Sequence, residues 1–145
     1  MTTKRQASDL VHLALPKGRM EAGVLALLAD AGIRVTFGRR GYRPALSLDG
    51  FETKILKPQN IVEMLHLGSR DVGFAGADWV AELAVDVVEL LDTGLDPVSV
   101  VAAATPEFAE NGLAEEPFVV ASEYERLTRA WLERRGLEAT FVQSY

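Results

Sequence analysis

Apolar residues along this chain form short continuous runs that alternate with helix-spaced stripes. The first run, Val11–Leu15, is almost wholly apolar and predicts a buried strand. Over Met20–Ala31, leucines and a valine recur on one face at helical spacing, so we expect an amphipathic helix there, and Gly32 ends it. A strand followed directly by such a helix is typical of a helix that packs back on a parallel sheet.

The same alternation continues to the end of the chain. Strands are predicted over residues 34–37, 45–48, 52–56, 71–75, 118–121 and 139–142, and helices over 59–67, 79–83 and 123–135. Pro58 suits the first position of its helix, and Asp78 suits an N-cap. Two further segments, Val87–Leu91 and Val98–Ala104, are apolar and β-rich, which favours strands. The pattern therefore predicts an α/β fold with a mostly parallel sheet.

The organisation indicates two lobes. Residues 105–116 are acidic and contain proline and glycine, so we expect a linker there between a first lobe over 11–104 and a second over 117–145. Residues 1–10 are predicted to be a disordered tail. The second lobe would hold only a strand, a helix and a strand, which is too little to bury a core. We therefore expect the second lobe to be incomplete, with a C-terminal part missing.

Composition narrows the class of protein. The chain has 145 residues, of which 48% are hydrophobic and 25% charged, and it has no cysteine, so disulfides and thiolate chemistry are excluded. Its N-terminus shows no signal peptide and no apolar run is long enough for a membrane span, so we expect a cytoplasmic protein without membrane contact. The negative charge and scattered aromatic residues argue against a nucleic-acid partner.

The charge is unevenly distributed. The net charge is +5 through Asn60 and −11 after it, which together give the chain's −6. Positive charge gathered in one part of an acidic protein indicates an anion site there. The alternative interpretation, a chance distribution of solvated surface charge, remains open from these residues alone.

Three strand exits carry the candidate chemistry. Pro16-Lys17-Gly18-Arg19 places two cations and a flexible glycine between a strand and a helix, where ligands of α/β sheets collect. Lys57 repeats the arrangement of strand, cation and helix. The third exit is Gly73-Phe-Ala-Gly76-Ala-Asp78, where glycines allow close approach and a carboxylate can accept hydrogen bonds from a ribose or an adenine. Each exit by itself is equally consistent with a solvated turn or a helix cap.

The remaining polar residues are less informative. Arg39, Arg40 and Arg43 lie in a glycine-bounded loop that suits either a phosphate or bulk solvent. His12 and His66 have no ligand-like neighbours and are interpreted as structural, and no metal site is predicted. The catalytic residues stay unknown, because no serine lies in a nucleophile elbow and no carboxylate pair can be placed.

The three exits in order resemble one family. The stretches "LALPKGRM", "ILKPQNIVEMLHLGSRDVGFAGADWV" and "PFVVASEYERLTRAWLERRGLEATFV" are similar to the catalytic chain of ATP phosphoribosyltransferase, the first enzyme of histidine biosynthesis. The resemblance covers nearly all of residues 11–145, and its middle stretch is the most specific. Lys57 stands where the family often has arginine, Glu125 stands where it has proline, and the connection near 105–116 is shorter than usual.

The resemblance implies a two-lobed fold like that of type II periplasmic binding proteins. It implies a glycosyltransferase that joins N1 of ATP to C1 of phosphoribosyl pyrophosphate (PRPP) and releases pyrophosphate, with Mg²⁺ required. Substrate-binding residues carried over by their positions are Lys17, Gly18, Arg19, Arg43, Lys57, Gly76 and Asp78. The resemblance implies that the four cations of that set neutralise phosphates. It implies that Gly76 and Asp78 line the nucleotide pocket. A homo-oligomer and a separate regulatory subunit are both compatible with the family.

One departure limits these expectations. The family's PRPP loop, an acidic residue followed by a Thr/Ser-Gly turn, comes after the last strand present here. We therefore expect that this chain does not catalyse the transfer alone. Two alternatives stay open: a non-catalytic nucleotide- or small-anion-binding module of the same fold class, and an accessory chain whose lobe another polypeptide completes. The Lys-Gly-Arg exit and the lack of a signal peptide argue against a solute receptor.

Overall fold

A computed structural model describes residues 9–112 and 117–145 of the chain. It separates into two compact units, one ending at Pro97 and the other beginning at Val98, and each is described by itself. Most of the predicted tail over 1–10, and residues 113–116 of the predicted linker, lie outside the described residues. The finer domain boundaries stay predictions.

The first unit is built on a three-stranded parallel sheet in the order β4-β1-β5. Its elements are β1 (Val11–Pro16), α1 (Glu21–Asp30), β2 (Val35–Thr36), β3 (Ala45–Leu46), β4 (Phe51–Leu56), α2 (Pro58–His66), β5 (Val72–Gly73) and α3 (Ala77–Leu83). The long strand β1 lies between its two partners, which explains why its sequence is a continuous apolar run and not an alternating one.

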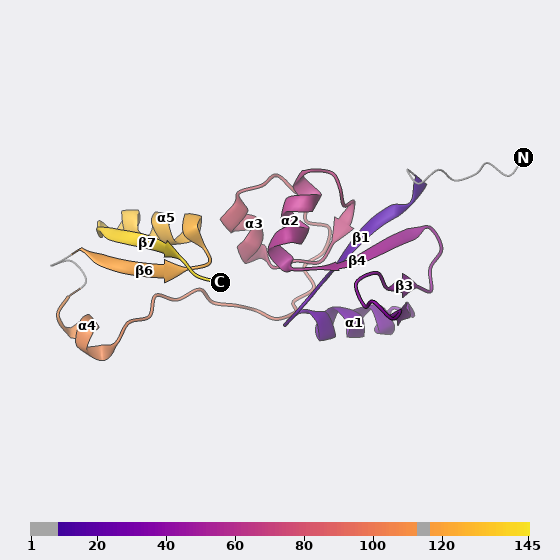
Figure 1. Cartoon of the computed structure of the whole chain (residues 1–145), viewed down its shortest axis with the longest axis horizontal. Helices are drawn as coiled ribbons and strands as arrows, with labels where there is room; N and C mark the ends of the chain where they lie inside the picture. Colours follow the sequence, from indigo (N-terminus) through magenta and orange to yellow (C-terminus); the bar gives the residue numbers. More distant parts are fainter. Residues whose placement is uncertain (1–8, 113–116) are drawn as a thin grey trace, which may run out of the picture. The chain divides into compact units, whose positions relative to one another are not determined.

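Helices cover both faces of this sheet (Figure 1). Leu13 and Leu15 of β1 form the core with Val24 and Leu28 of α1. Ala14, between these leucines, faces the other way because side chains alternate along a strand, and it lies beside β5 on the side of α2. The two helices thereby bury the centre of the sheet, whereas the residues that follow β1 and β4 are exposed.

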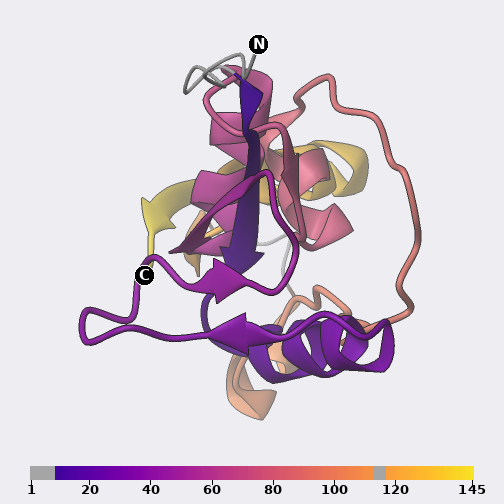
Figure 2. The ribbon, with the colours of Figure 1, turned by 90° about the vertical axis from the view of Figure 1, so that its right-hand side faces the viewer.

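A second, antiparallel pair joins β2 to β3, with Val35 opposite Leu46. The chain between them, residues 37–44, forms a loop that extends from this pair and is exposed except at Pro44 (Figure 2). After α3 the chain is irregular up to Pro97. The expectation of a strand over Val87–Leu91 is wrong: that segment has no partner strand among the described residues, and Val88 and Leu90 are about four-fifths exposed.

The second unit contains α4 (Pro106–Glu110), β6 (Phe118–Ser122), α5 (Glu125–Arg135) and β7 (Ala139–Gln143). β6 and β7 pair in parallel, and α5 connects them as a crossover helix that ends at Gly136 in the left-handed conformation. The strand expected over Val98–Ala104 does not form, and the predicted linker holds the short helix α4, which Thr105 caps by accepting the Phe108 N–H.

The α/β class and the mostly parallel sheets are confirmed. The arrangement of two lobes around a shared site stays a prediction. Within the part of the chain that the structure describes, no helix is both long and apolar enough to cross a membrane.

Candidate functional site

The carboxyl ends of β1 and β4 bring Lys17 and Lys57 next to each other. Pro16 lies opposite Leu56 in the parallel register, and the Lys17 N–H donates to the Leu56 carbonyl at 2.8 Å. Each lysine is the first residue after its strand, and both are exposed. The prediction that two strand exits share one sheet edge is confirmed for this pair.

The turn after β1 exposes backbone donors at the same edge. Gly18 has a φ of +90°, a conformation that glycine adopts without strain, and its carbonyl accepts the Glu21 N–H at 3.0 Å as α1 begins. The N–H groups of Gly18 and Arg19 have no hydrogen-bond acceptor within residues 9–112 and 117–145. Free N–H groups at the start of a helix favour negative charge.

Lys17 contacts an aromatic ring instead of a carboxylate. Its Nζ atom lies 5.6 Å from the centroid of the Tyr42 ring, within the range of a cation–π contact. Tyr42 belongs to the loop over residues 37–44, and its carbonyl accepts the Ile55 N–H of β4 at 3.0 Å. No ion pair of Lys57 is found among the described residues. Neither lysine therefore has a carboxylate partner in the described part of the chain.

The two arginines of the predicted site are each paired with an acid. Arg19 Nε lies 3.3 Å from Asp96 Oδ2, and Arg43 Nη1 lies 3.7 Å from Glu52 Oε1. Both arginine side chains are largely exposed, so these pairs stabilise the fold only weakly. They nevertheless offset positive charge that an incoming anion would otherwise meet.

The third exit differs in detail from its prediction. The N-cap of α3 is Gly76, and Asp78 lies in the first turn, so the expectation that Asp78 is the N-cap is wrong. The Asp78 carboxylate folds back over Gly76, where any Cβ atom would collide with its Oδ1 atom. A side chain at position 76 would therefore make the Asp78 carboxylate turn away, whereas the φ of −73° at Gly76 is open to any residue.

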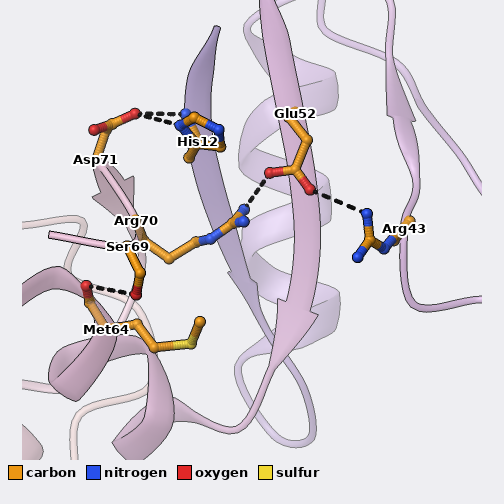
Figure 3. A network of polar contacts seen from close by, with 7 residues as sticks. All are labelled: His12, Arg43, Glu52, Met64, Ser69, Arg70 and Asp71. Carbon is orange, nitrogen blue, oxygen red and sulfur yellow. Dashed lines mark hydrogen bonds and ion pairs between the residues drawn. The ribbon is translucent and has the colours of Figure 1, made fainter. Parts of the chain in front are cut away.

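A second polar network lies toward the opposite, amino edge of the sheet (Figure 3). The His12 N–H donates to Asp71 Oδ2 at 2.8 Å, and His12 Nδ1 lies 3.0 Å from the same oxygen. These contacts, with Arg70 nearby, hold the pKa of Asp71 below its ordinary value. Arg70 is buried and donates to Glu52 at 2.5 Å.

Sequence reasoning missed Tyr42, Glu52 and Asp96 as neighbours of the predicted site residues. Arg19 and Asp96 are 77 positions apart, so no spacing rule connects them. For Tyr42 a weak signal exists, because it is the aromatic residue of the glycine-bounded arginine loop. Lys17, Gly18 and Lys57 are brought together at one edge, and Gly76 follows the neighbouring strand, whereas Arg43 is held toward Glu52.

Comparison with known proteins identifies the family. The family model described as HisG: ATP phosphoribosyltransferase matches residues 57–145, which is more than half of the chain. The chain belongs to the ATP phosphoribosyltransferase family. Among its relatives, the ATP phosphoribosyltransferase of Chlorobium phaeobacteroides is 30% identical over 143 residues, covering 94% of this chain and 49% of that protein. The one from Prosthecochloris aestuarii is 36% identical over 86 residues, covering 59% of this chain and 29% of that protein.

A solved structure has the same fold. A chain of the ATP phosphoribosyl transferase (HisG:HisZ) complex from Thermotoga maritima superposes with a TM-score of 0.68 at 20% identity, covering 94% of this chain and 65% of that one. The ATP phosphoribosyltransferase from Pelotomaculum thermopropionicum is 28% identical and covers 93% of this chain. The matches to these relatives cover nearly all of this chain, but the chain spans only about half of their length.

Proposed function

We propose that the carboxyl edge of the β4-β1-β5 sheet is the phosphate-binding side of an ATP phosphoribosyltransferase. In the reaction, N1 of ATP forms a bond to C1 of PRPP while the bond from C1 to the pyrophosphate oxygen breaks, in the first step of histidine biosynthesis. The observation that carries the proposal is the pair Lys17 and Lys57, side by side and without carboxylate partners in the described chain.

The proposed reaction does not need a covalent nucleophile from the protein. A ribosyl cation develops as pyrophosphate leaves, so positioning the substrates and stabilising the leaving phosphates are the main demands on the protein. Lys17 and Lys57 supply point charges for phosphate oxygens, and the free N–H groups of Gly18 and Arg19 supply directed donors. Gly76 and Asp78 line the neighbouring exit, where the carboxylate can accept hydrogen bonds from the nucleoside.

The residues at this edge do not fit a magnesium site held by the protein. Mg²⁺ prefers oxygen ligands, and of the side chains predicted for this site only Asp78 carries a carboxylate, while Asp96 already pairs with Arg19. Across the described residues, no group of three or more His, Asp or Glu side chains is arranged to hold a metal. Mg²⁺ would therefore arrive with the pyrophosphate group of the substrate.

The proposal is tested through substrate binding and not through turnover alone, because the chain spans about half the length of its relatives. Isothermal titration of the purified chain with ATP and with pyrophosphate tests it. We expect Lys17→Ala and Lys57→Ala each to weaken binding about tenfold or more, as losing a charged hydrogen bond does. Arg34→Ala is the control, because Arg34 is an exposed cation that follows the C-terminal end of α1, whereas the site lies before the N-terminal end of that helix.

Equal affinity in wild type and both lysine variants would contradict the proposal. An assay with ATP, PRPP and Mg²⁺ adds a second readout. Binding without turnover would favour the alternative of a nucleotide- or anion-binding module for this length of chain, and turnover would contradict the expectation that the PRPP loop is needed. The partner named with the Thermotoga maritima structure makes a regulatory subunit a further proposal for this chain, testable by co-purification.

A further inference from the structure

We propose that Tyr42 is a positioning residue that holds the Lys17 ammonium at the phosphate site without neutralising it. In consequence, Lys17 and Lys57 bind the substrate phosphates, whereas the side chains of Arg19 and Arg43, already paired with carboxylates, contribute less to binding. The inference rests on the proposed function of this sheet edge and adds to it a division of roles among the four cations predicted from the sequence.

The first step is the difference between the partners of the four cations. Arg19 faces the Asp96 carboxylate at 3.3 Å and Arg43 faces the Glu52 carboxylate at 3.7 Å. An anion that binds either arginine must compete with a full negative charge already in place. Among the residues that the structure describes, Lys17 faces the ring of Tyr42 and no carboxylate. A ring attracts a cation through its quadrupole but carries no net charge, so Lys17 is oriented while its potential is retained.

The second step is the anchoring of Tyr42 itself. Its carbonyl accepts the Ile55 N–H at 3.0 Å, and its own N–H donates to the Arg40 carbonyl at 2.7 Å. Ile55 lies two residues before Lys57, so this bond ties the loop to the end of β4. The preceding Gly41 has a φ of +61°, which permits the tight turn. The ring is therefore held beside the same strand ends that carry both lysines.

The third step is accessibility. Tyr42 is 63% exposed and is not part of the hydrophobic core of the unit. A large aromatic residue held by its backbone at an exposed edge gains little from packing there. The contact with Lys17 is the one polar or ring interaction of the Tyr42 side chain found in the described chain. A lysine that this contact already holds in place loses less conformational freedom when a ligand binds.

The experiment compares Tyr42→Phe with Tyr42→Leu in the full chain. Phenylalanine keeps the ring, whereas leucine keeps apolar bulk and removes the quadrupole. Pyrophosphate and ATP are titrated by calorimetry, and urea unfolding is measured for each variant. We expect Tyr42→Phe to bind like wild type and Tyr42→Leu to bind about threefold to fivefold more weakly with an unchanged urea midpoint, as an exposed cation–π contact implies.

A double-mutant cycle with Lys17→Ala separates positioning from packing. Once Lys17 is absent, Tyr42→Leu should cause no further loss of affinity, because Tyr42 acts through Lys17. Arg19→Ala and Arg43→Ala should each weaken binding less than Lys17→Ala does. The inference is overturned if Tyr42→Leu binds like wild type, if its effect is additive with Lys17→Ala, or if either arginine variant loses as much affinity as Lys17→Ala.

These outcomes are distinct from failure of the proposed function. If the wild-type chain binds neither pyrophosphate nor ATP, or if Lys17→Ala and Lys57→Ala bind normally, the anion site itself is wrong. If both lysines matter and Tyr42 does not, the site stands and only the positioning role is rejected.

Discussion

Asp71 shows how a single exposed carboxylate connects two strands. It accepts the backbone N–H of His12 and lies against the His12 ring, so it joins the starts of β1 and β5. Because hydrogen bonds and positive charge favour the ionised form, the pKa of Asp71 falls below its ordinary value of 3.8. The carboxylate therefore stabilises the folded state only while it is ionised.

The pH dependence follows from the direction of this shift. A group whose pKa is lower in the folded state adds stability above its unfolded pKa, and this is lost as the pH falls through the folded pKa. We expect wild type to be more stable than Asp71→Asn at neutral pH, with the difference shrinking below about pH 4. Urea unfolding from pH 3 to 7 measures it, with the exposed Asp86→Asn as control. A difference that grows on acidification would contradict the sign.

Arg70 offers a sharper test of buried charge. Its side chain is 5% exposed and binds Glu52, whereas Arg43 binds the same carboxylate from an exposed position. Arg70→Met removes the buried partner and should lower the free energy of unfolding by about 1–3 kcal/mol. Arg43→Met is the matched control and should cost below about 1 kcal/mol. Equal urea midpoints for the two variants would show that burial does not decide the strength of this pair.

At the scale of elements, the close packing of α2 on β5 depends on Gly73. A Cβ atom there would lie 2.6 Å from Ile61 Cγ2, and Ile61 is fully buried. The strand and the helix therefore approach each other at a distance that only glycine allows.

Gly73→Ala should consequently destabilise the protein by about 1–3 kcal/mol through overpacking. Gly38→Ala is the control, because a Cβ at that exposed position meets no atom within 4 Å. In a double-mutant cycle, Ile61→Ala should remove most of the extra cost of Gly73→Ala, since the clashing methyl group is gone. Additive losses in thermal or urea unfolding would place the strain elsewhere.

At the scale of the whole molecule, the two compact units divide where regular structure is absent. Residues 98–105 are exposed throughout and form no helix or strand. Val11–Pro16 is equally apolar in sequence but is buried between two strands. Two segments of similar apolar sequence therefore differ in solvent exposure: residues 98–105 are exposed, whereas Val11–Pro16 is largely buried.

Limited proteolysis with elastase, which cleaves after small aliphatic residues, reads out this difference. We expect the first cleavage within residues 98–105, because a protease needs an extended, accessible segment, and we expect β1 to resist until the unit unfolds. Mass spectrometry of the early fragments locates the cut. First cleavage within Val11–Pro16, or no preference between the two segments, would contradict the structure.

Local signals predicted the elements that are stabilised by their own residues or by a near neighbour. Pro58 begins α2 as expected, and Gly136 ends α5 in the left-handed conformation. Local signals failed where a partner was needed. Val87–Leu91 and Val98–Ala104 have β-prone residues, yet a strand also requires a neighbour to hydrogen-bond, and the described chain provides none.

The same distinction applies to the candidate site. The order of residues alone determined the alternation of strands and helices and placed cations directly after two strands, because backbone propensities and strand polarity act over a few residues. The tertiary structure alone decided that Arg19 and Arg43 are paired with acids while Lys17 meets the Tyr42 ring. Charge at a site depends on neighbours brought in from distant positions, and only the packing of the sheet and its loops establishes those distances.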